Sequence, residues 1–371
     1  MGPRKVAYLT PLYFDETSCL GGGERYPVNL AIGIVKAGGG SVSVDVISYG
    51  DESLTRELAP GVVLRVLRAA VRPKHPLDVT SWDLPAAIAD ADLVHVHMIY
   101  TRSNEFGLLA AKVQGKPVVV TDHGGASSTI GRELGALDLA DRVVAYSDFG
   151  ASFYPSGMDV TVIKGGVDGG LFTPAPAGRR PERDRVLYVG RLLPHKGIDV
   201  LIEALPAGLP LTVCGRAYHD DYFARLKALS EGKRVEFVTD ADDARILDLY
   251  RRAWVNVLPS VYRDCYGQTH AAPELMGFTL LEAMACGTPA ICSRVAAMPE
   301  FVDHGRTGYV FDTPADLREQ LLRLAGDPGL VERMGREARR AVDEEFGLTV
   351  AGRRLLDVYR GLVPHSQEAA A

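Results

Sequence analysis

The stretch 258–293 constrains the fold more than any other part of the chain, because a helix signal is followed directly by a strand signal. The run Leu-Leu-Glu-Ala-Met-Ala-Cys-Gly at 280–287 predicts a helix that ends at Gly287. Pro289 follows, and the apolar residues after it predict a short buried strand. A helix that leads at once into a buried strand is typical of α/β domains.

Two carboxylates belong to this stretch. We expect Glu274 on a loop or at the helix start and Glu282 about two helical turns further along. Glu282 has small and apolar neighbours, where a carboxylate needs a partner, and this disfavours the alternative that both are solvated charges. The first N–H groups of the helix, near Leu275, Met276 and Gly277, have no partner within the helix and can bind an oxygen-rich ligand. The spacing suits a ligand with two separate diol groups, such as a sugar and a ribose.

Two cations follow a buried strand in the middle of the chain. Residues 186–189 predict that strand, which runs into Gly190 and Arg191 and then into Lys196-Gly197 and a helix. An arginine fork and a lysine point charge at a strand end suit a diphosphate. A cation pair without a ligand is the alternative for these two residues read alone.

The chain begins with a similar arrangement. Residues 5–10 predict a buried strand, the loop 11–23 ends in three glycines, and 24–37 predict a helix. Backbone N–H groups of such a loop, at Gly22 and Gly23 here, can reach a phosphate. A plain turn between strand and helix is the alternative. The spacing is not G-x-G-x-x-G, which disfavours a dehydrogenase.

Polar residues also follow two further predicted strands, 92–98 and 117–122. His97 ends the first strand, and His123 stands before two glycines after the second. In open α/β sheets ligands bind at the carboxyl ends of strands, so both histidines are placed where a ligand would lie.

These motifs together resemble one family. Pro-Glu-x-x-Gly-x-x-Leu-Leu-Glu-Ala-Met-Ala-Cys-Gly-Thr-Pro is similar to the E-x7-E signature of retaining glycosyltransferases of family 4, which have the GT-B fold. Gly-Arg-x4-Lys-Gly resembles the diphosphate motif of that family, Gly-Gly-x-Glu-Arg its first glycine loop, and Val-Val-Val-Thr-Asp-His-Gly-Gly the segment whose histidine lies beside the reacting sugar. The sequence departs from the family at Glu274-Leu-Met-Gly277, where Glu-Pro-Phe-Gly is usual, and in a longer loop at 261–273.

The resemblance implies a GT-B fold, in which two Rossmann-like, doubly wound parallel-sheet domains face a cleft. We expect an acceptor-side domain at 1–172, completed by about 350–371, and a nucleotide-sugar domain at 185–349. Residues 173–184, rich in proline and charge, read as the linker. The last helix is expected to cross back to the first domain near 348–353.

The activity implied by the resemblance is transfer of a sugar from a nucleoside diphosphate sugar to a hydroxyl acceptor, with retention at the anomeric carbon. The expected catalytic residues are His123, Arg191, Lys196 and Glu274. The expected donor contacts are Gly22, Gly23, Gly190, Arg191, Lys196, Glu274, Leu275, Met276, Gly277 and Glu282. Weaker candidates for acceptor contacts are His97, Tyr100, Arg102 and Asn104.

The composition of the chain disfavours several classes of binding partner. A net charge of −6 disfavours nucleic-acid binding, and the five cysteines form no C-x-x-C pair. No D-x-D cluster stands in a suitable place, so we expect neither a metal nor a cofactor beyond the co-substrate. No apolar run approaches the length of about 18 residues that spans a membrane, which predicts a cytoplasmic protein. The basic residues of 61–76 allow contact with an anionic acceptor or with a membrane surface, although a solvated edge strand and loop is the simpler reading.

Other functions remain open at this level. A sugar phosphorylase, a nucleotide-sugar epimerase and a catalytically silent nucleotide-sugar-binding protein are alternatives on the same fold. The sequence leaves the base, the sugar, the acceptor and the oligomeric state open.

Overall fold

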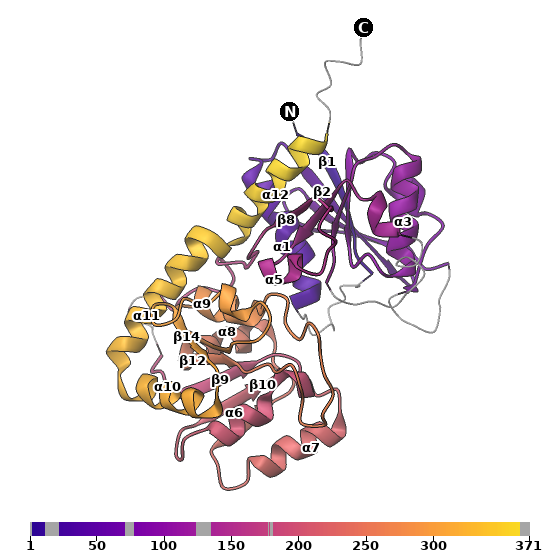
Figure 1. Cartoon of the computed structure of the whole chain (residues 1–371). Coiled ribbons are helices and arrows are strands. Elements are labelled where there is room, and N and C mark those ends of the chain that lie inside the picture. Colours follow the sequence, from indigo (N-terminus) through magenta and orange to yellow (C-terminus); the bar gives the residue numbers. More distant parts are fainter. Residues whose placement is uncertain are drawn as a thin grey trace. The chain divides into compact units, whose positions relative to one another are not determined.

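The computed structural model describes residues 2–11, 22–70, 78–123, 135–176, 178 and 181–363, which form two compact units (Figure 1). The first unit comprises Met1–Gly166 together with Leu348–Ala371, and the second comprises Val167–Gly347. Each unit has a sheet of its own.

The sheet of the first unit is almost entirely parallel. Its strands are β1 (Lys5–Leu9), β2 (Ser43–Gly50), β3 (Leu54–Ala59), β4 (Val62–Arg68), β5 (Leu93–His97), β6 (Val118–Thr121), β7 (Arg142–Ala145) and β8 (Val160–Val162). They lie in the order β3-β4-β2-β1-β5-β6-β7-β8, and only β3 pairs antiparallel with its neighbour. Sequence patterning missed β3, whose polar Leu-Thr-Arg-Glu-Leu-Ala run is partly exposed at the sheet edge and carries no apolar face.

Helices of the first unit are α1 (Gly22–Ala37), α2 (Leu84–Ala87), α3 (Arg102–Val113), η2 (Ala136–Leu139), α5 (Asp148–Ala151) and α12 (Leu348–Leu362). One apolar cluster of the core lies between the sheet and the helices α2 and α3. The central strands are buried on both faces, as expected for parallel strands covered by helices.

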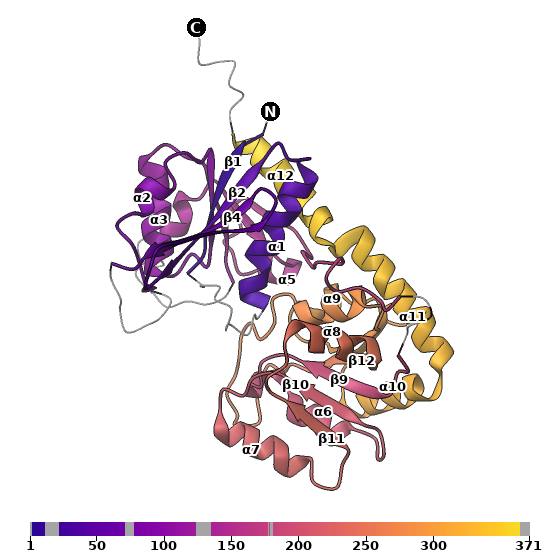
Figure 2. The ribbon, with the colours of Figure 1, turned by 180° about the vertical axis from the view of Figure 1, so that it is seen from behind.

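The last helix, α12, packs against α1, and both views show the two side by side (Figure 2). Their backbones touch: a Cβ on Gly33 would come within 2.1 Å of the Leu348 carbonyl oxygen, and a Cβ on Gly352 within 2.1 Å of the Gly33 carbonyl carbon. Tyr359 of α12 also reaches the sheet, where its hydroxyl lies 2.9 Å from that of Tyr8. The predicted return of the C-terminal helix to the first domain is confirmed, and α12 begins inside the range expected for the crossover.

The second unit contains a fully parallel sheet. Its strands are β9 (Arg185–Val189), β10 (Leu211–Cys214), β11 (Val235–Val238), β12 (Ala253–Leu258), β13 (Ala290–Ser293) and β14 (Gly308–Phe311), in the order β11-β10-β9-β12-β13-β14. Its helices are η3 (Pro194–Lys196), α6 (Ile198–Ala204), α7 (Asp220–Leu229), α8 (Asp243–Arg252), α9 (Phe278–Ala285), η4 (Met298–Glu300), α10 (Pro314–Gly326), α11 (Pro328–Ala341) and the π-helical turn η5 (Val342–Phe346). The strand order reverses at β9, which has β10 on one side and β12 on the other.

The division between the units falls earlier than the predicted boundary at 172, because the segment after Gly166 is held by the second unit. Arg339 Nη1 donates to the carbonyl oxygens of Gly169 and Phe172, at 3.0 and 3.2 Å. Arg251 Nε donates to the carbonyl oxygen of Thr173 at 2.8 Å. The described residues of the predicted linker, 173–176, 178 and 181–184, therefore lie within the second unit.

The basic run of 61–76 is only partly available to a membrane or an anionic acceptor. Arg65 lies on β4, and its Nη1 donates to Asp45 Oδ2 at 3.1 Å and to the Ala87 carbonyl oxygen at 3.0 Å. Arg68 is exposed at the end of β4, whereas residues 71–77, which include Arg72 and Lys74, are outside the described residues. Within the described part of the chain, none of the helices is both long and apolar enough to cross a membrane.

Candidate active site

The carboxyl end of the second sheet gathers the residues predicted for a donor. The strand order reverses between β9 and β12, and in open α/β sheets ligands bind at the carboxyl ends of the strands at such a switch point. The loop after β9 carries Arg191 and Lys196, and the loop after β12 carries Glu274. The two loops touch, because Val261 N–H donates to the His195 carbonyl oxygen at 2.9 Å.

Lys196 and Glu274 form an ion pair between Nζ and Oε1. Each side chain is 11% exposed, so the pair is largely withdrawn from water. Ser260 Oγ donates to the same oxygen of Glu274 at 3.3 Å, and Oε2 has no hydrogen-bond partner among the residues that the structure describes. The diphosphate motif and the glutamate motif therefore meet at the Lys196–Glu274 ion pair. Glu274 Oε2 is left as an acceptor for a ligand hydroxyl.

A glycine at position 197 allows the loops that follow β9 and β12 to touch. Gly197 has a φ of 65°, and a Cβ there would lie 2.1 Å from the Pro259 carbonyl oxygen. Any side chain at this position would force the β9 and β12 loops apart and separate the ion pair.

Arg191 provides the second cation of the strand-end motif. Its side chain is exposed, and it makes no ion pair with the described residues. The Tyr188 hydroxyl fixes its backbone by donating to its carbonyl oxygen at 2.9 Å. Gly190 before it has a φ of 153° and donates its N–H to Cys214 O at 3.0 Å. An exposed guanidinium on an anchored backbone can turn toward a phosphate.

Glu282 is buried on α9, as its apolar neighbours predict, and is 5% exposed. Its Oε2 accepts a hydrogen bond from the Tyr250 hydroxyl at 2.8 Å, which supplies the partner that a buried carboxylate requires. Burial and the nearby charge of Glu282 raise the pKa of Tyr250 well above its ordinary value, so the phenol keeps its proton and donates. Sequence patterning did not identify Tyr250, which comes from α8.

The start of α9 lies between the two glutamates. Gly277 caps the helix with a φ of 72°, Met276 is buried, and Leu275 and Glu274 are partly exposed. The helix ends at Ala285, and Gly287, with a φ of 72°, follows its end as predicted.

In the first unit, the predicted glycine loop is described only from Gly22, where α1 begins; residues 12–21 lie outside the described part of the chain. Contacts of Gly22 and Gly23 with a diphosphate stay predictions.

The His123 side chain belongs to a hydrogen-bonded network of aromatic and imidazole rings. Its Nε2 lies 3.0 Å from His97 Nδ1, and its Nδ1 is hydrogen-bonded to the Tyr146 hydroxyl. Burial lowers the pKa of His123 to about 3 and the pKa of His97 well below its ordinary value, so both rings are neutral near pH 7. Both ring nitrogens of His123 therefore have partners within the first unit, and the ring can hydrogen-bond to a ligand only if one of these partners is lost. Tyr146, which sequence patterning did not single out, completes this arrangement.

The acceptor candidates occupy different environments. Asn104 is fully buried, and its amide donates to the carbonyl oxygens of His97 and Met98. It holds the turn after β5, where Met98 has the unusual φ of 66° for a residue with a side chain. Arg102 is exposed and lies 3.6 Å from Asp78, whereas Tyr100 is partly exposed.

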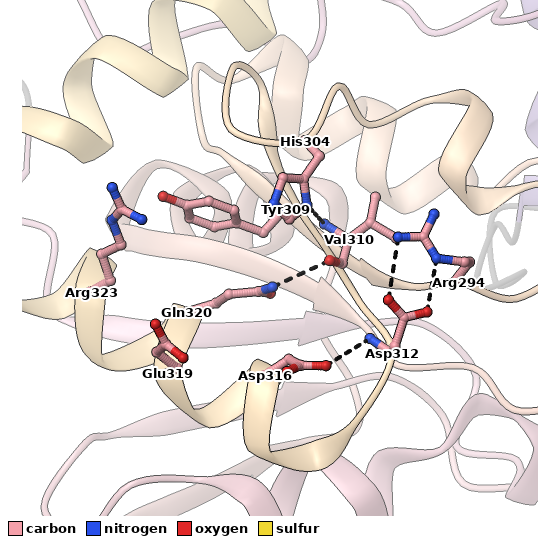
Figure 3. A pocket seen from close by; sticks show the side chains of 9 residues that line it. All are labelled: Arg294, His304, Tyr309, Val310, Asp312, Asp316, Glu319, Gln320 and Arg323. Carbon is pink, nitrogen blue, oxygen red and sulfur yellow. Dashed lines mark hydrogen bonds and ion pairs between the residues drawn. The ribbon is translucent and has the colours of Figure 1, made fainter.

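A further pocket of about 290 Å³ lies beside β14 and α10 (Figure 3). Two of its charged residues form an ion pair, in which Arg294 Nε donates to Asp312 Oδ1 at 2.8 Å. None of the residues predicted for the donor lines it. The donor residues and this pocket are separate features of the second unit.

Comparison with known proteins agrees with the fold. The sequence model described as "Glycosyltransferase Family 4" matches residues 20–170, and the model described as "Glycosyl transferases group 1" matches residues 173–341. Two parallel α/β units matched in this order define a glycosyltransferase with the GT-B fold. The chain belongs to the family 4 type of these enzymes, as its motifs predicted.

Curated relatives carry glycosyltransferase names. D-inositol 3-phosphate glycosyltransferase from Streptomyces bingchenggensis is 28% identical over 433 residues, covering 96% of this chain and 89% of that protein. Glycogen synthase from Mycobacterium tuberculosis is 28% identical over 342 residues, covering 84% of this chain and 77% of that protein.

Solved structures share the fold. Sucrose-phosphate synthase from Thermosynechococcus elongatus matches with a TM-score of 0.72 and 23% identity, over 97% of this chain and 99% of that one. HepE from Anabaena, solved in complex with UDP and glucose, matches with a TM-score of 0.69 and 17% identity, over 97% of this chain and 100% of that one.

Proposed function

We propose that this glycosyltransferase uses a nucleoside diphosphate sugar and transfers its sugar, with retention and without a metal ion, to a hydroxyl acceptor. The observation that carries the proposal is the Lys196–Glu274 ion pair at the carboxyl end of the second sheet, beside the exposed Arg191. It joins a carboxylate suited to sugar hydroxyls with two cations suited to a diphosphate.

The roles proposed for Lys196 and Arg191 follow from the charge that develops during sugar transfer. As the bond from sugar to diphosphate breaks, negative charge grows on the leaving phosphate and positive charge on the sugar ring. Lys196 has three N–H donors, so it can keep its contact with Glu274 while it donates to a phosphate oxygen. Arg191 adds a forked donor to the same group. Both cations stabilise the transition state more than the bound donor.

Glu274 and Glu282 are assigned to the two ends of the donor. Oε2 of Glu274 accepts from hydroxyls of the sugar, and Glu282, beside Tyr250, accepts from the ribose. The UDP and glucose bound to HepE, which shares the fold, support a nucleotide sugar as the donor class. The two cations near the diphosphate supply the charge that a divalent ion would otherwise provide, which supports metal independence.

Donor binding is the first test. A thermal-shift series with UDP-, GDP-, ADP- and dTDP-sugars should give a concentration-dependent rise in Tm with one nucleotide class, because a ligand that binds the folded state stabilises it. Failure of every nucleotide sugar to raise Tm would overturn the proposed donor class.

The chemistry is tested on the donor so identified. NMR of the glycoside formed should give the same anomeric configuration as the donor, and EDTA should leave the rate unchanged. Inversion, or a rate that requires added Mg²⁺ or Mn²⁺, would contradict the corresponding part of the proposal. Product that requires inorganic phosphate would indicate a phosphorylase, and sugar conversion without an acceptor would indicate an epimerase.

A further inference from the structure

The loop 261–273, which is longer than in the family pattern, is an ordered structure with its own hydrogen bonds. Arg263 and Thr269 form an antiparallel bridge, and Asp264 lies at the centre of the loop. Asp264 Oδ1 accepts from the N–H groups of Tyr266 and Gln268 at 2.9 and 3.0 Å, while its Oδ2 lies 2.9 Å from His270 Nε2. A loop fixed in this way presents its outward side chains in defined positions.

This loop forms one wall of a cavity of about 810 Å³ within the second unit. The segment 193–195 and the first turn of α7 with the residues before it, 218–222, form the other walls. The cavity adjoins the proposed donor position, because His195 precedes Lys196 and its carbonyl oxygen accepts from Val261 N–H at 2.9 Å. Neither Glu274 nor Glu282 lines it, so it is a separate subsite beside the donor.

The lining of the cavity has a distinct chemistry. Tyr218 and Tyr266 are 52% and 57% exposed, although both carry large rings. Asp220 and Asp221 contribute carboxylates, whereas both oxygens of Asp264 are engaged within the loop, and no lysine or arginine is among the lining residues. Arg216 Cζ lies 5.7 Å from the ring centroid of Tyr218, so one cation stands close to the lining. The carboxylates repel phosphates and other anions, which disfavours the diphosphate as the occupant.

His195 adds no positive charge to the cavity near pH 7. His195 and His270 pack with ring centroids 4.9 Å apart. Burial, reinforced by the charge of Lys196, lowers the pKa of His195 to about 3, so this ring is neutral near pH 7. Among the described residues, no three histidine, cysteine or acidic side chains converge in a way that could hold a metal ion.

Exposed aromatic rings beside carboxylate and imidazole groups suit a sugar. A sugar ring offers apolar C–H faces that pack on aromatic rings, and its hydroxyl groups donate to carboxylates. We propose that the cavity binds a neutral sugar unit of the acceptor, next to the donor. This inference rests on the proposed function, because the donor is assigned to the neighbouring Lys196–Glu274 position and the acceptor is the remaining substrate.

The test uses the full-length protein on an array of neutral gluco-, galacto- and manno-configured oligosaccharides, with phosphorylated and sulfated glycans printed beside them. Wild-type protein should bind a subset of the neutral glycans and none of the anionic ones. Tyr266→Ala should weaken that binding by about tenfold or more, because it removes a stacking ring, whereas Tyr266→Phe should keep it within about threefold. Asp221→Asn should also weaken it, and the same change at the surface residue Asp248, outside the cavity, should not.

Three outcomes would overturn the proposal: no neutral glycan bound by wild type, a preference for anionic glycans, or equal binding by wild type and Tyr266→Ala. Because Tyr266 is exposed, its variants should keep the Tm of the wild type, which separates lost binding from lost folding. Nucleotide sugars should still raise the Tm of Tyr266→Ala. If nucleotide sugars raise the Tm of the wild type but the wild type binds no neutral glycan, the cavity assignment is wrong and the donor assignment stands. If nucleotide sugars do not raise the Tm of the wild type, the proposed function itself is wrong.

Discussion

Lys196 and Glu274 form an ion pair across 78 residues of sequence, and both side chains are largely buried. Removal of either partner leaves the other charge in a site with little water, which costs more than the pair contributes to stability. The two residues therefore act as a unit, and substitutions at one must be interpreted with the other in view.

Glu274→Gln tests the sugar end of this unit. The change keeps the shape of the side chain but removes the negative charge that faces the sugar, so kcat/KM should fall by about 10²–10³-fold. Affinity for the bare nucleoside diphosphate, measured by calorimetry, should stay near the wild-type value. Asp248→Asn is the matched control and should leave both quantities unchanged; wild-type kcat in Glu274→Gln would remove Glu274 from the reaction.

Arg191 tests the diphosphate end. Because its side chain is exposed and makes no ion pair with the described residues, Arg191→Ala should fold normally and still lower kcat/KM by about 10²–10³-fold. Arg191→Lys should recover only part of the loss, since a point charge does not reproduce the fork. The double variant with Lys196→Ala should lose less than the product of the single losses, because both cations act on one group. Normal turnover in both single variants would move the diphosphate site elsewhere.

Substitutions at Glu282 and Tyr250 test whether Glu282 binds the ligand or only supports the fold. Tyr250→Phe leaves Glu282 in place without its phenol donor, and Glu282→Gln keeps an acceptor without the charge. Both should lower the free energy of unfolding by about 1–3 kcal/mol, but only Glu282→Gln should weaken nucleoside diphosphate binding, by about tenfold or more. Urea denaturation and calorimetry measure the two effects. Equal affinity in both variants and the wild type would assign Glu282 to folding alone.

The close contact of α1 and α12 predicts a strong stability effect. Gly352→Val places a side chain where the Gly33 backbone lies, so the helices must separate and the free energy of unfolding should fall by about 1–3 kcal/mol or more. Gly361→Ala, near the end of the same helix and with open space around it, is the matched control and should have little effect. Differential scanning calorimetry measures both, and an unchanged Tm in Gly352→Val would contradict the backbone contact.

The burial of His95 leads us to expect that the stability of the protein depends on pH. It is fully buried between the Tyr359 hydroxyl and Thr121, and burial lowers its pKa to about 3. The unfolded chain, with a histidine pKa of about 6.5, therefore takes up a proton first as the pH falls. Stability should decline below about pH 6.5, by up to about 1.4 kcal/mol per pH unit from this residue.

The check is urea denaturation at about pH 7 and pH 5 for the wild type and His95→Gln. The variant should be less stable at the higher pH but should lose less on acidification. The same loss in both proteins would show that His95 does not cause the dependence.

The sequence by itself determined the class of the protein and supplied the donor residues that are proposed here. Apolar runs marked the central strands of both sheets because a parallel strand buried on both faces tolerates few polar side chains. Glycines and charged residues at strand ends marked the site because the chain must turn there and expose backbone N–H groups. The family resemblance of these motifs is borne out by the matches over both halves of the chain.

Only the tertiary structure decided which distant residues meet. No local pattern shows that Tyr250 on α8 supplies the partner of Glu282, that Tyr146 and His97 occupy both nitrogens of His123, or that Asn104 supports a strained turn rather than facing outward. The polar edge strand β3 and the attachment of 167–184 to the second unit were also missed, because pairing and arginine-to-carbonyl contacts hold them rather than an apolar pattern. Such contacts join residues far apart in sequence, and their partners are set by how helices and loops pack, which periodicity and spacing do not encode.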